Sequence, residues 1–273
     1  MKKVTGLCIS LLFAVMLAAC ASTSEKLDPN MSAEDYFNRG NEYAKKKDNA
    51  NALADFGRAI RLDPDNAPYY YRRADLRSHM GGSVQPVIDD FNQAIRLDPN
   101  NASYYFARGN YYDGLGASFT GNNKETVDRF RSDFYNRAGD DYIQAIKLDP
   151  DNVSYYKRLG NFHERTTSSY ELAIVYYSLA IQLDPNNELL YSDRGGTYFK
   201  NRQYALAIAD LSEAIKLDKR PTSGYYYNLR GQAYYNLRNY DSAIADYEEA
   251  VRLDPGYTNY QKNLEQARQA RGR

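Results

Sequence analysis

Residues 59–64 have the sequence AIRLDP, and the chain repeats this phrase with small variations along most of its length. The later copies stand at residues 94–99, 145–150, 180–185, 214–219 and 250–255. Their last positions are separated by 35, 51, 35, 34 and 36 residues. A period close to 34 residues is typical of stacked units that each contact only their neighbours. The chain is therefore expected to form a solenoid, whose function is binding rather than catalysis.

A second motif, Tyr-x-x-Arg-Gly-x-x-Tyr, precedes the first one in each unit. It stands at residues 36–43, 105–112, 191–198 and 227–234, with looser copies at 70–77 and 156–163. Small and apolar residues recur at three- and four-residue spacing, which predicts two amphipathic helices per unit. The second helix should end at Asp-Pro, because proline cannot continue a helix and disfavours the helical conformation of the residue before it. The predicted N-caps are Ser32, Asn66, Asn101, Asn152, Asn187 and Thr222 or Ser223.

Together the two motifs place small and aromatic residues in an order that resembles the tetratricopeptide repeat. The later slots of the first copy hold Ala52, Phe56, Ala59 and Pro64. Tyrosine stands where the family usually has tryptophan, in keeping with a chain of 28 Tyr and no Trp. The resemblance covers residues 32–256. It implies an all-α fold, namely an α-solenoid of six helix-turn-helix repeats forming a right-handed superhelix, with a C-terminal capping helix.

The motif spacing gives domain boundaries. The predicted segments are a lipoprotein signal peptide (1–19), a lipidated tether (20–31), six repeats (32–65, 66–100, 101–151, 152–186, 187–220 and 221–256) and a capping helix (257–273). The third repeat carries an insert at about 114–134. Its start, residues 114–123, has the composition of a loop. Its continuation predicts that the second helix begins early. The insert is either part of a binding face or a tolerated surface insertion.

One charge pattern is expected to be structural. Five repeats carry an arginine in the first helix and an aspartate in the second, whereas the fourth has Leu159 and Tyr176 in these slots. Because both charges disappear together, we interpret them as a partly buried ion pair within each repeat. A ligand role for the arginines is the alternative. The arginines are Arg39, Arg73, Arg108, Arg194 and Arg230, and the aspartates are Asp55, Asp90, Asp141, Asp210 and Asp246.

The N-terminus predicts export. Two lysines precede a short apolar stretch, residues 7–17, and the sequence Leu17-Ala-Ala-Cys20 resembles the lipobox of bacterial lipoprotein precursors. The resemblance implies that Cys20 is acylated, which anchors the chain to a membrane. Ala21 at the next position implies an outer-membrane lipoprotein facing the periplasm, with exposure on the cell surface left open. The alternative is an uncleaved anchor at residues 4–21.

Composition argues against several other functions. The chain has 35 basic and 35 acidic residues and only two histidines, so neither a nucleic-acid-binding surface nor a metal site is expected. His163 fills a slot that is Tyr in most repeats and is expected to be structural. No nucleophile and base stand in a catalytic arrangement, so neither an enzyme nor a cofactor is predicted.

The resemblance also implies where a partner would bind. In this family the first helices line a groove that accepts peptides, and aromatic and amide side chains suit such a surface. Lys157 and Asn161 resemble part of the family's carboxylate clamp, whose other basic residues are missing here. The matching slots hold Phe37, Asn41, Tyr71, Asp75, Phe106, Asn110, Lys157, Asn161, Ser192, Gly196, Asn228 and Gln232, with Tyr235 one turn further.

The sequence therefore favours a lipid-anchored envelope adaptor that binds a partner protein through this groove. A glycan- or peptidoglycan-binding lipoprotein is the alternative. The core slots expected for Tyr36, Tyr70, Tyr105, Tyr156, Tyr191 and Tyr227 weaken it, while the adjacent tyrosines are expected to pack between repeats. Self-association into a homo-oligomer, through the end helices or the insert, also stays open.

Overall fold

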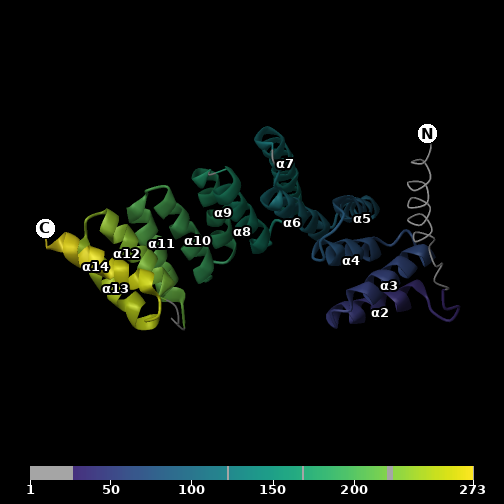
Figure 1. Ribbon diagram of the computed structural model, residues 1–273, viewed down its shortest axis with the longest axis horizontal. Helices are drawn as coiled ribbons and strands as arrows, with labels where there is room; N and C mark the ends of the chain where they lie inside the picture. Colours follow the sequence, from purple (N-terminus) through teal and green to yellow (C-terminus); the bar gives the residue numbers. More distant parts are fainter. Residues whose placement is uncertain (1–26, 122, 168, 220–223, 273) are drawn as a thin grey trace, which may run out of the picture. The chain divides into compact units, whose positions relative to one another are not determined.

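The computed structural model describes residues 27–121, 123–167, 169–219 and 224–272, and the regular structure in these ranges is helical (Figure 1). The predicted signal peptide and Cys20 lie outside the described residues. Two compact units divide at Leu97. Unit 1 contains α2 (Ala33–Lys45), α3 (Asn49–Leu62), α4 (Ala67–Ser78) and α5 (Val84–Leu97).

Unit 2 begins at Asp98 and contains the remaining helices in sequence order (Figure 1). Neighbouring helices pair into hairpins within each unit, and successive hairpins stack. This arrangement confirms the predicted all-α, solenoid-type fold. The helices of unit 2 are α6 (Ala102–Ser118), α7 (Lys124–Leu148), α8 (Val153–Phe162), the π-helix η1 (His163–Thr167), α9 (Tyr170–Leu183), α10 (Glu188–Lys200), α11 (Tyr204–Leu217), α12 (Tyr225–Asn236), α13 (Tyr240–Leu253) and α14 (Thr258–Arg271).

The turns between hairpins are held by the asparagine that was predicted as an N-cap. The side chains of Asn101, Asn152 and Asn187 each accept a hydrogen bond from the second residue of the following helix, at 3.2 Å. The same side chains donate to the aspartate that ends the preceding helix. Asn66 makes only the second bond, because the residue that would donate to it is Pro68, which has no N–H.

The first helix of the last repeat, α12, does not begin with an asparagine cap. Its N-cap is Gly224, and the predicted caps Thr222 and Ser223 lie outside the described residues. The backbone N–H of Gly224 donates to the Asp254 carboxylate at 2.6 Å. This bond ties the start of α12 to the end of α13.

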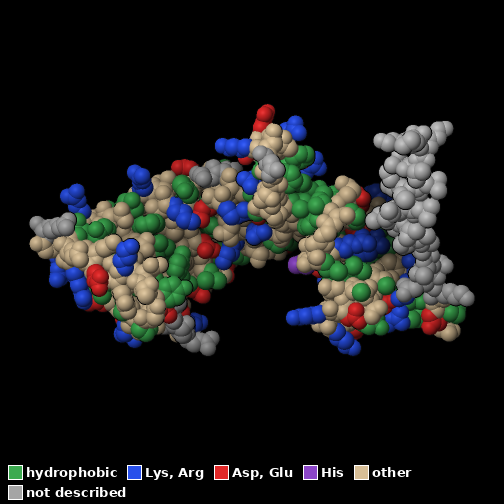
Figure 2. Space-filling view, viewed as in Figure 1, with side chains coloured by type: hydrophobic (Ala, Val, Ile, Leu, Met, Phe, Trp, Pro, Cys, Tyr) green, Lys and Arg blue, Asp and Glu red, His purple; other side chains and the backbone are tan. Residues whose placement is uncertain are grey.

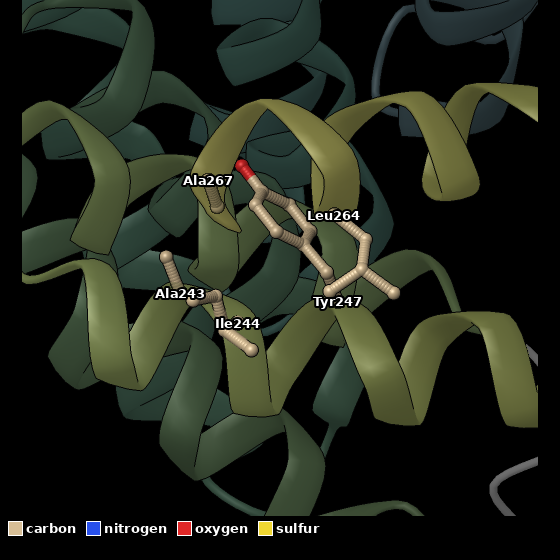
Figure 3. Packing of buried hydrophobic residues seen from close by; sticks show 5 residues of the cluster. All are labelled: Ala243, Ile244, Tyr247, Leu264 and Ala267. Atoms are coloured by element: carbon tan, nitrogen blue, oxygen red, sulfur yellow. The ribbon is translucent and has the colours of Figure 1, made fainter. Parts of the chain in front are cut away.

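The core of each hairpin that carries a motif glycine is a close contact between that glycine and a large side chain, which is a ring in four hairpins and Leu211 in α10–α11. A Cβ placed on Gly160 of α8 would lie 2.8 Å from the ring of Tyr177, so only glycine lets α8 and α9 approach this closely. At the C-terminal end, Tyr247 of α13 packs with Ala243 and Ile244 against Leu264 and Ala267 of α14 (Figure 3). The last helix thus covers the apolar face of α13, as expected of a capping helix.

The tyrosine slots differ from the prediction. Tyr36 is buried, but Tyr70, Tyr105, Tyr156, Tyr191 and Tyr227 are only partly buried. Where the preceding position holds Tyr69 or Tyr155, that ring is the buried one, 4.8 Å from Phe37 and 4.6 Å from Phe106 of the preceding hairpin. Packing between repeats therefore uses the adjacent tyrosines, as expected, whereas the motif tyrosines lie at the edge of the core.

The insert of the third repeat is mostly helical. The early start predicted for the second helix is confirmed, since α7 runs from Lys124. The predicted loop at residues 114–123 is wrong in its first half, because α6 continues to Ser118. The glycine that suggested a loop allows close packing instead: a Cβ on Gly116 would overlap the ring of Tyr135. The two helices form a long hairpin whose outer end carries charged side chains (Figure 2).

Within the described part of the chain, no helix is both long enough and apolar enough to cross a membrane.

Candidate functional site

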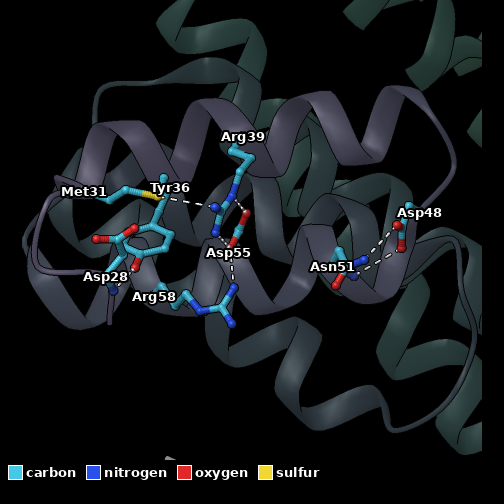
Figure 4. A network of polar contacts seen from close by, with 8 residues as sticks. All are labelled: Asp28, Met31, Tyr36, Arg39, Asp48, Asn51, Asp55 and Arg58. Atoms are coloured by element: carbon cyan, nitrogen blue, oxygen red, sulfur yellow. Dashed lines mark hydrogen bonds and ion pairs between the residues drawn. The ribbon is translucent and has the colours of Figure 1, made fainter. Parts of the chain in front are cut away.

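The arginine and aspartate residues that recur in five of the repeats have a structural role. In unit 1 the Arg39 guanidinium donates two hydrogen bonds to Asp55, at 2.6 and 2.9 Å, and lies over the ring of Tyr36 (Figure 4). The same two-bond geometry joins the other four predicted pairs, and each arginine covers its own motif tyrosine. The predicted ion pair is therefore confirmed, and these arginines are occupied by their aspartates.

Burial and pairing oppose each other at these carboxylates. The Asp55 side chain is fully buried, which by itself raises its pKa, but hydrogen bonds from Arg39 and Arg58 outweigh burial and hold the pKa below its usual value. The ionised pair is thus the stable form of this hairpin at neutral pH.

The fourth repeat replaces this pair with stacked rings. Leu159 is fully buried, and Tyr176 stacks on His163 with ring centroids 5.4 Å apart and planes 5° apart. Here α8 passes into η1, a π-helical turn of the kind often found at functional sites. Within this turn Arg165 pairs with the buried Asp113 of α6, while Glu164 accepts hydrogen bonds from Thr197 and Lys200 of α10. One turn therefore joins three successive first helices.

A pocket of about 230 Å³ lies beside this turn, which we call the acidic pocket. Its polar wall holds two carboxylates, Glu164 and Asp193, and the buried Tyr177 hydroxyl donates to Asn161 Oδ1 at 2.6 Å. The complete lining is Asn161, Glu164, Tyr177, Ser192, Asp193, Gly196, Phe199, Lys200, Tyr225 and Leu229.

The two carboxylates have lysine partners. Lys200 Nζ lies 2.5 Å from Glu164, and Lys157 Nζ lies 3.1 Å from Asp193 Oδ2. The second contact is an ion pair without hydrogen-bond geometry, and Asp193 Oδ2 is buried without a hydrogen-bond donor. Burial raises the pKa of Asp193, with Lys157 opposing the shift. Burial likewise raises the pKa of Tyr177, and the charges of Glu164 and Asp193 add to that effect.

A larger pocket of about 740 Å³, which we call the amide pocket, lies between α12 and α14. Asn263 donates to Asn228 Oδ1 at 2.8 Å across it, and the rings of Tyr257 and Tyr260 stack 5.0 Å apart. Its lining holds amides, aromatic rings and one carboxylate. The complete lining is Tyr225, Asn228, Gln232, Asp254, Tyr257, Asn259, Tyr260 and Asn263.

Tyr225 lines both pockets, so they adjoin along α8, α10, α12 and α14. Amide, hydroxyl and aromatic groups follow this line, and such groups can bind both the backbone and the side chains of a peptide. The described residues contain no cluster of His, Cys, Asp and Glu that could hold a metal ion. On the visible face of the molecule basic and acidic side chains are intermixed (Figure 2).

The predicted groove residues of unit 1 are used internally. Phe37 packs on Phe56 and Tyr69, and Asn41 accepts a hydrogen bond from Arg72 at 3.0 Å. Tyr71 packs against Phe91. Asp75 pairs with Arg72 at 3.1 Å.

In unit 2 the structure brings part of the predicted set together. Phe106 packs between rings, and Asn110 accepts a hydrogen bond from Tyr142. Tyr235 packs against the core cluster of α13 and α14 and touches Tyr240. Lys157 makes the ion pair described above. The remaining predicted residues line a pocket: Asn161, Ser192 and Gly196 the acidic one, and Asn228 and Gln232 the amide one.

Sequence reasoning missed one slot. The residue two positions after the motif tyrosine faces the first helix of the preceding repeat: Arg72 bonds Asn41, Arg158 pairs with Asp113, and Asp193 pairs with Lys157. Asn263 of α14 takes the same role towards Asn228. This slot has no fixed residue type, so only its position in the repeat could have indicated these contacts. Asn263 could not have been found in this way, because α14 lacks the motif.

A family model described as "Tetratricopeptide repeat" matches residues 127–188 and 193–258, and a second model of the same description matches residues 33–66. The curated relatives match over a short segment. Human serine/threonine-protein phosphatase 5 is 43% identical over 51 residues, which are 19% of this chain and 10% of the phosphatase.

Solved structures share the fold over most of the chain. YrrB, described as a TPR protein with an unusual peptide-binding site, covers 77% of this chain and 97% of its own, with 19% identity and a TM-score of 0.59. The pilF protein of Pseudomonas aeruginosa covers 86% of this chain and 97% of its own, with 17% identity and a TM-score of 0.60. Because the family models together match more than half of it, this chain belongs to the tetratricopeptide-repeat family, whose members generally act as scaffolds for protein–protein interaction rather than as enzymes.

Proposed function

We propose that this protein is an adaptor, anchored to the bacterial outer membrane through a lipid on Cys20, that binds an extended segment of a partner protein on unit 2. The observation that carries the binding proposal is the pair of adjoining pockets that meet at Tyr225. A segment lying along α8, α10, α12 and α14 would contact amides of α8, α12 and α14, and amides both donate to and accept from a peptide backbone.

The Gln232 side chain supports this choice of face. It lines the amide pocket, and within the described residues it has no hydrogen-bond partner, in contrast to Asn228 beside it. Tyr225 and Tyr257 are 50% and 60% exposed, so they offer apolar area with few rotamers to immobilise.

Site-specific photocrosslinking from the intact envelope tests the binding proposal. A photoreactive residue at Asn161 or Gln232 is expected to capture one defined protein. The control position is Leu206 of α11, which is 49% exposed and lines neither pocket. Equal capture from all three positions would rule out the proposed face.

The anchor is tested separately, because it rests on the sequence alone. Metabolic labelling with an alkyne fatty acid should mark the wild-type protein and the Cys8→Ser variant, but not Cys20→Ser. Cys8 is a matched control, since it lies in the same predicted signal peptide without the lipobox context. Absence of label from the wild-type protein would instead favour the uncleaved anchor, and label that persists in Cys20→Ser would rule out Cys20 as the acylated residue.

A saccharide ligand is the second candidate function, and the amide pocket is the observation that favours it. Three tyrosines and four amides line the pocket without a basic residue, which suits an uncharged hydroxylated ligand as well. Retention of the purified protein on peptidoglycan, lost in Tyr257→Ala, would support this candidate. Absence of retention would remove it.

A further inference from the structure

Resting on the proposed function, we infer that the partner segment is cationic, and that one of its arginine or lysine side chains enters the acidic pocket between Glu164 and Asp193. Lys157 and Asn161 resemble part of the family's carboxylate clamp, which would bind the opposite charge, but the other basic residues of that clamp are missing here. Lys157 is already paired with Asp193, so the structure does not leave it as a free carboxylate ligand.

Asp193 is an incompletely satisfied carboxylate. A carboxylate can accept about four hydrogen bonds. The buried Oδ2 atom of Asp193 has no hydrogen-bond donor among the described residues, and its one charged contact is the ion pair with Lys157 at 3.1 Å, although the side chain is only 32% exposed. A guanidinium or ammonium group in the pocket would supply the missing donors, and hydrogen bonds between charged groups are the stronger kind.

The ion pairs of the pocket differ from those that hold the fold. Within the repeats of unit 2, arginine binds aspartate through two hydrogen bonds, and the arginine side chains are largely covered: 18% exposed at Arg194 and 19% at Arg230. At the pocket the cations are lysines, which make a single contact on a flexible stem, and Lys200 is 53% exposed. We therefore interpret Lys200 as an internal occupant that an incoming cation can displace.

The charge of the pocket lining also favours a cationic partner segment. The two pockets together are lined by Glu164, Asp193 and Asp254, against Lys200 as the one basic lining residue. This surface attracts a basic segment and disfavours an acidic one.

The apolar wall suits a long basic side chain. Phe199, Leu229 and Tyr225 also line the acidic pocket, and the alkyl stem of lysine or arginine can pack on such residues. A cation near the face of Tyr225 gains further stabilisation from the ring. The volume of about 230 Å³ limits the pocket to a single side chain rather than a folded element.

A synthetic peptide library with one fixed position at a time, passed over the immobilised protein, tests the inference. The wild-type protein should enrich peptides with Arg or Lys at one position. The double variant Glu164→Gln with Asp193→Asn should lose that enrichment, on the order of a hundredfold, because each of the two charge-assisted bonds contributes roughly a factor of ten. The matched control, Glu125→Gln with Asp128→Asn, removes two exposed carboxylates of α7 and should retain it.

The Lys200→Met variant gives a second measurement, in which both pocket carboxylates stay in place. Removing the internal cation should raise the enrichment of basic peptides severalfold, while circular dichroism confirms that the fold persists. Groove-bound peptides with no basic preference, or an unchanged preference in the double variant, would overturn the inference and leave the proposed function standing. If no peptide is retained and no partner crosslinks, both fail.

Discussion

Two neighbouring hairpins of unit 2, α8–α9 and α10–α11, join their two helices with different side chains. In α10–α11 the helices are joined by Arg194 and Asp210, whereas α8–α9 has Leu159 and the stacked rings of Tyr176 and His163. Both hairpins keep the glycine at which the helices approach. The comparison teaches that the close approach is the fixed requirement of the hairpin, and that polar or apolar groups can close the junction beside it.

The departure from the motif also coincides with the candidate site. Where the arginine is absent, α8 passes into η1, and Glu164 of that turn lines the acidic pocket. The repeats that follow the motif most closely, such as α2–α3, use their groove residues for internal packing.

The largest effect should come from leaving one member of an ion pair alone. Asp141→Ala removes the carboxylate that compensates the charge of the partly buried Arg108 in α6, and we expect a loss of about 3–5 kcal/mol in the free energy of unfolding. Asp140→Ala, at the exposed neighbouring position, should change it by less than about 0.5 kcal/mol. Chemical denaturation of both variants measures the difference, and equal losses would show that the pair adds nothing special.

A smaller effect should follow from filling the glycine slot. Gly160→Ala puts a methyl group 2.8 Å from the ring of Tyr177, which is buried and hydrogen-bonded and so has little room to move. We expect a loss of about 1–3 kcal/mol. Gly139→Ala is the control, since its Cβ would make an ordinary contact at 3.5 Å with Phe162 and gain helix propensity. A neutral Gly160→Ala would contradict the close-approach requirement.

Replacing the ion pair of α10–α11 with the corresponding residues of α8–α9 should change the free energy of unfolding little. Arg194→Leu combined with Asp210→Tyr copies the α8–α9 residues into α10–α11, and replacing both members of a buried pair is often neutral, within about 1.5 kcal/mol. The unfolding midpoint of the double variant, compared with each single variant, gives the coupling energy of the pair. A double variant as unstable as Asp210→Tyr alone would mean that the two junctions are not interchangeable.

The smallest effect is a pH dependence confined to α8–α9. Burial lowers the pKa of His163 from its ordinary value of 6.5, so the folded state favours the neutral ring. This contribution is complete above about pH 6.5 and is lost as the pH falls from there through the lower pKa of the folded protein, because the unfolded chain binds the proton first. His163→Tyr, which introduces the residue found in this slot of α2, α6, α10 and α12, should lose less stability between pH 7.5 and pH 5.5. Identical losses in both proteins would assign the dependence to other groups.

Much of the site could not be predicted from the motif. The sequence placed Asn161, Asn228 and Gln232 on the face that holds the pockets, because Asn161 and Gln232 occupy one repeat slot and Asn228 occupies the slot four residues before it. It did not indicate Glu164 or Asn263, because the first lies in a π-helical turn and the second in a helix without the motif. It also did not indicate that Asn41 would bond to Arg72 of the next repeat, since that partner is fixed by stacking, or that Asn110 would accept a hydrogen bond from Tyr142 of its own hairpin.

The sequence by itself determined the helical hairpins, their period, the ends at Asp-Pro, the asparagine caps and the five ion pairs. All of these are local, or lie within one repeating unit whose spacing recurs along the chain. The tertiary structure decided which tyrosines are buried, where α6 ends, which groove residues are already bonded and where the pockets lie. These features depend on how one repeat packs against the next, and a period shared by every repeat carries no information on the differences between them.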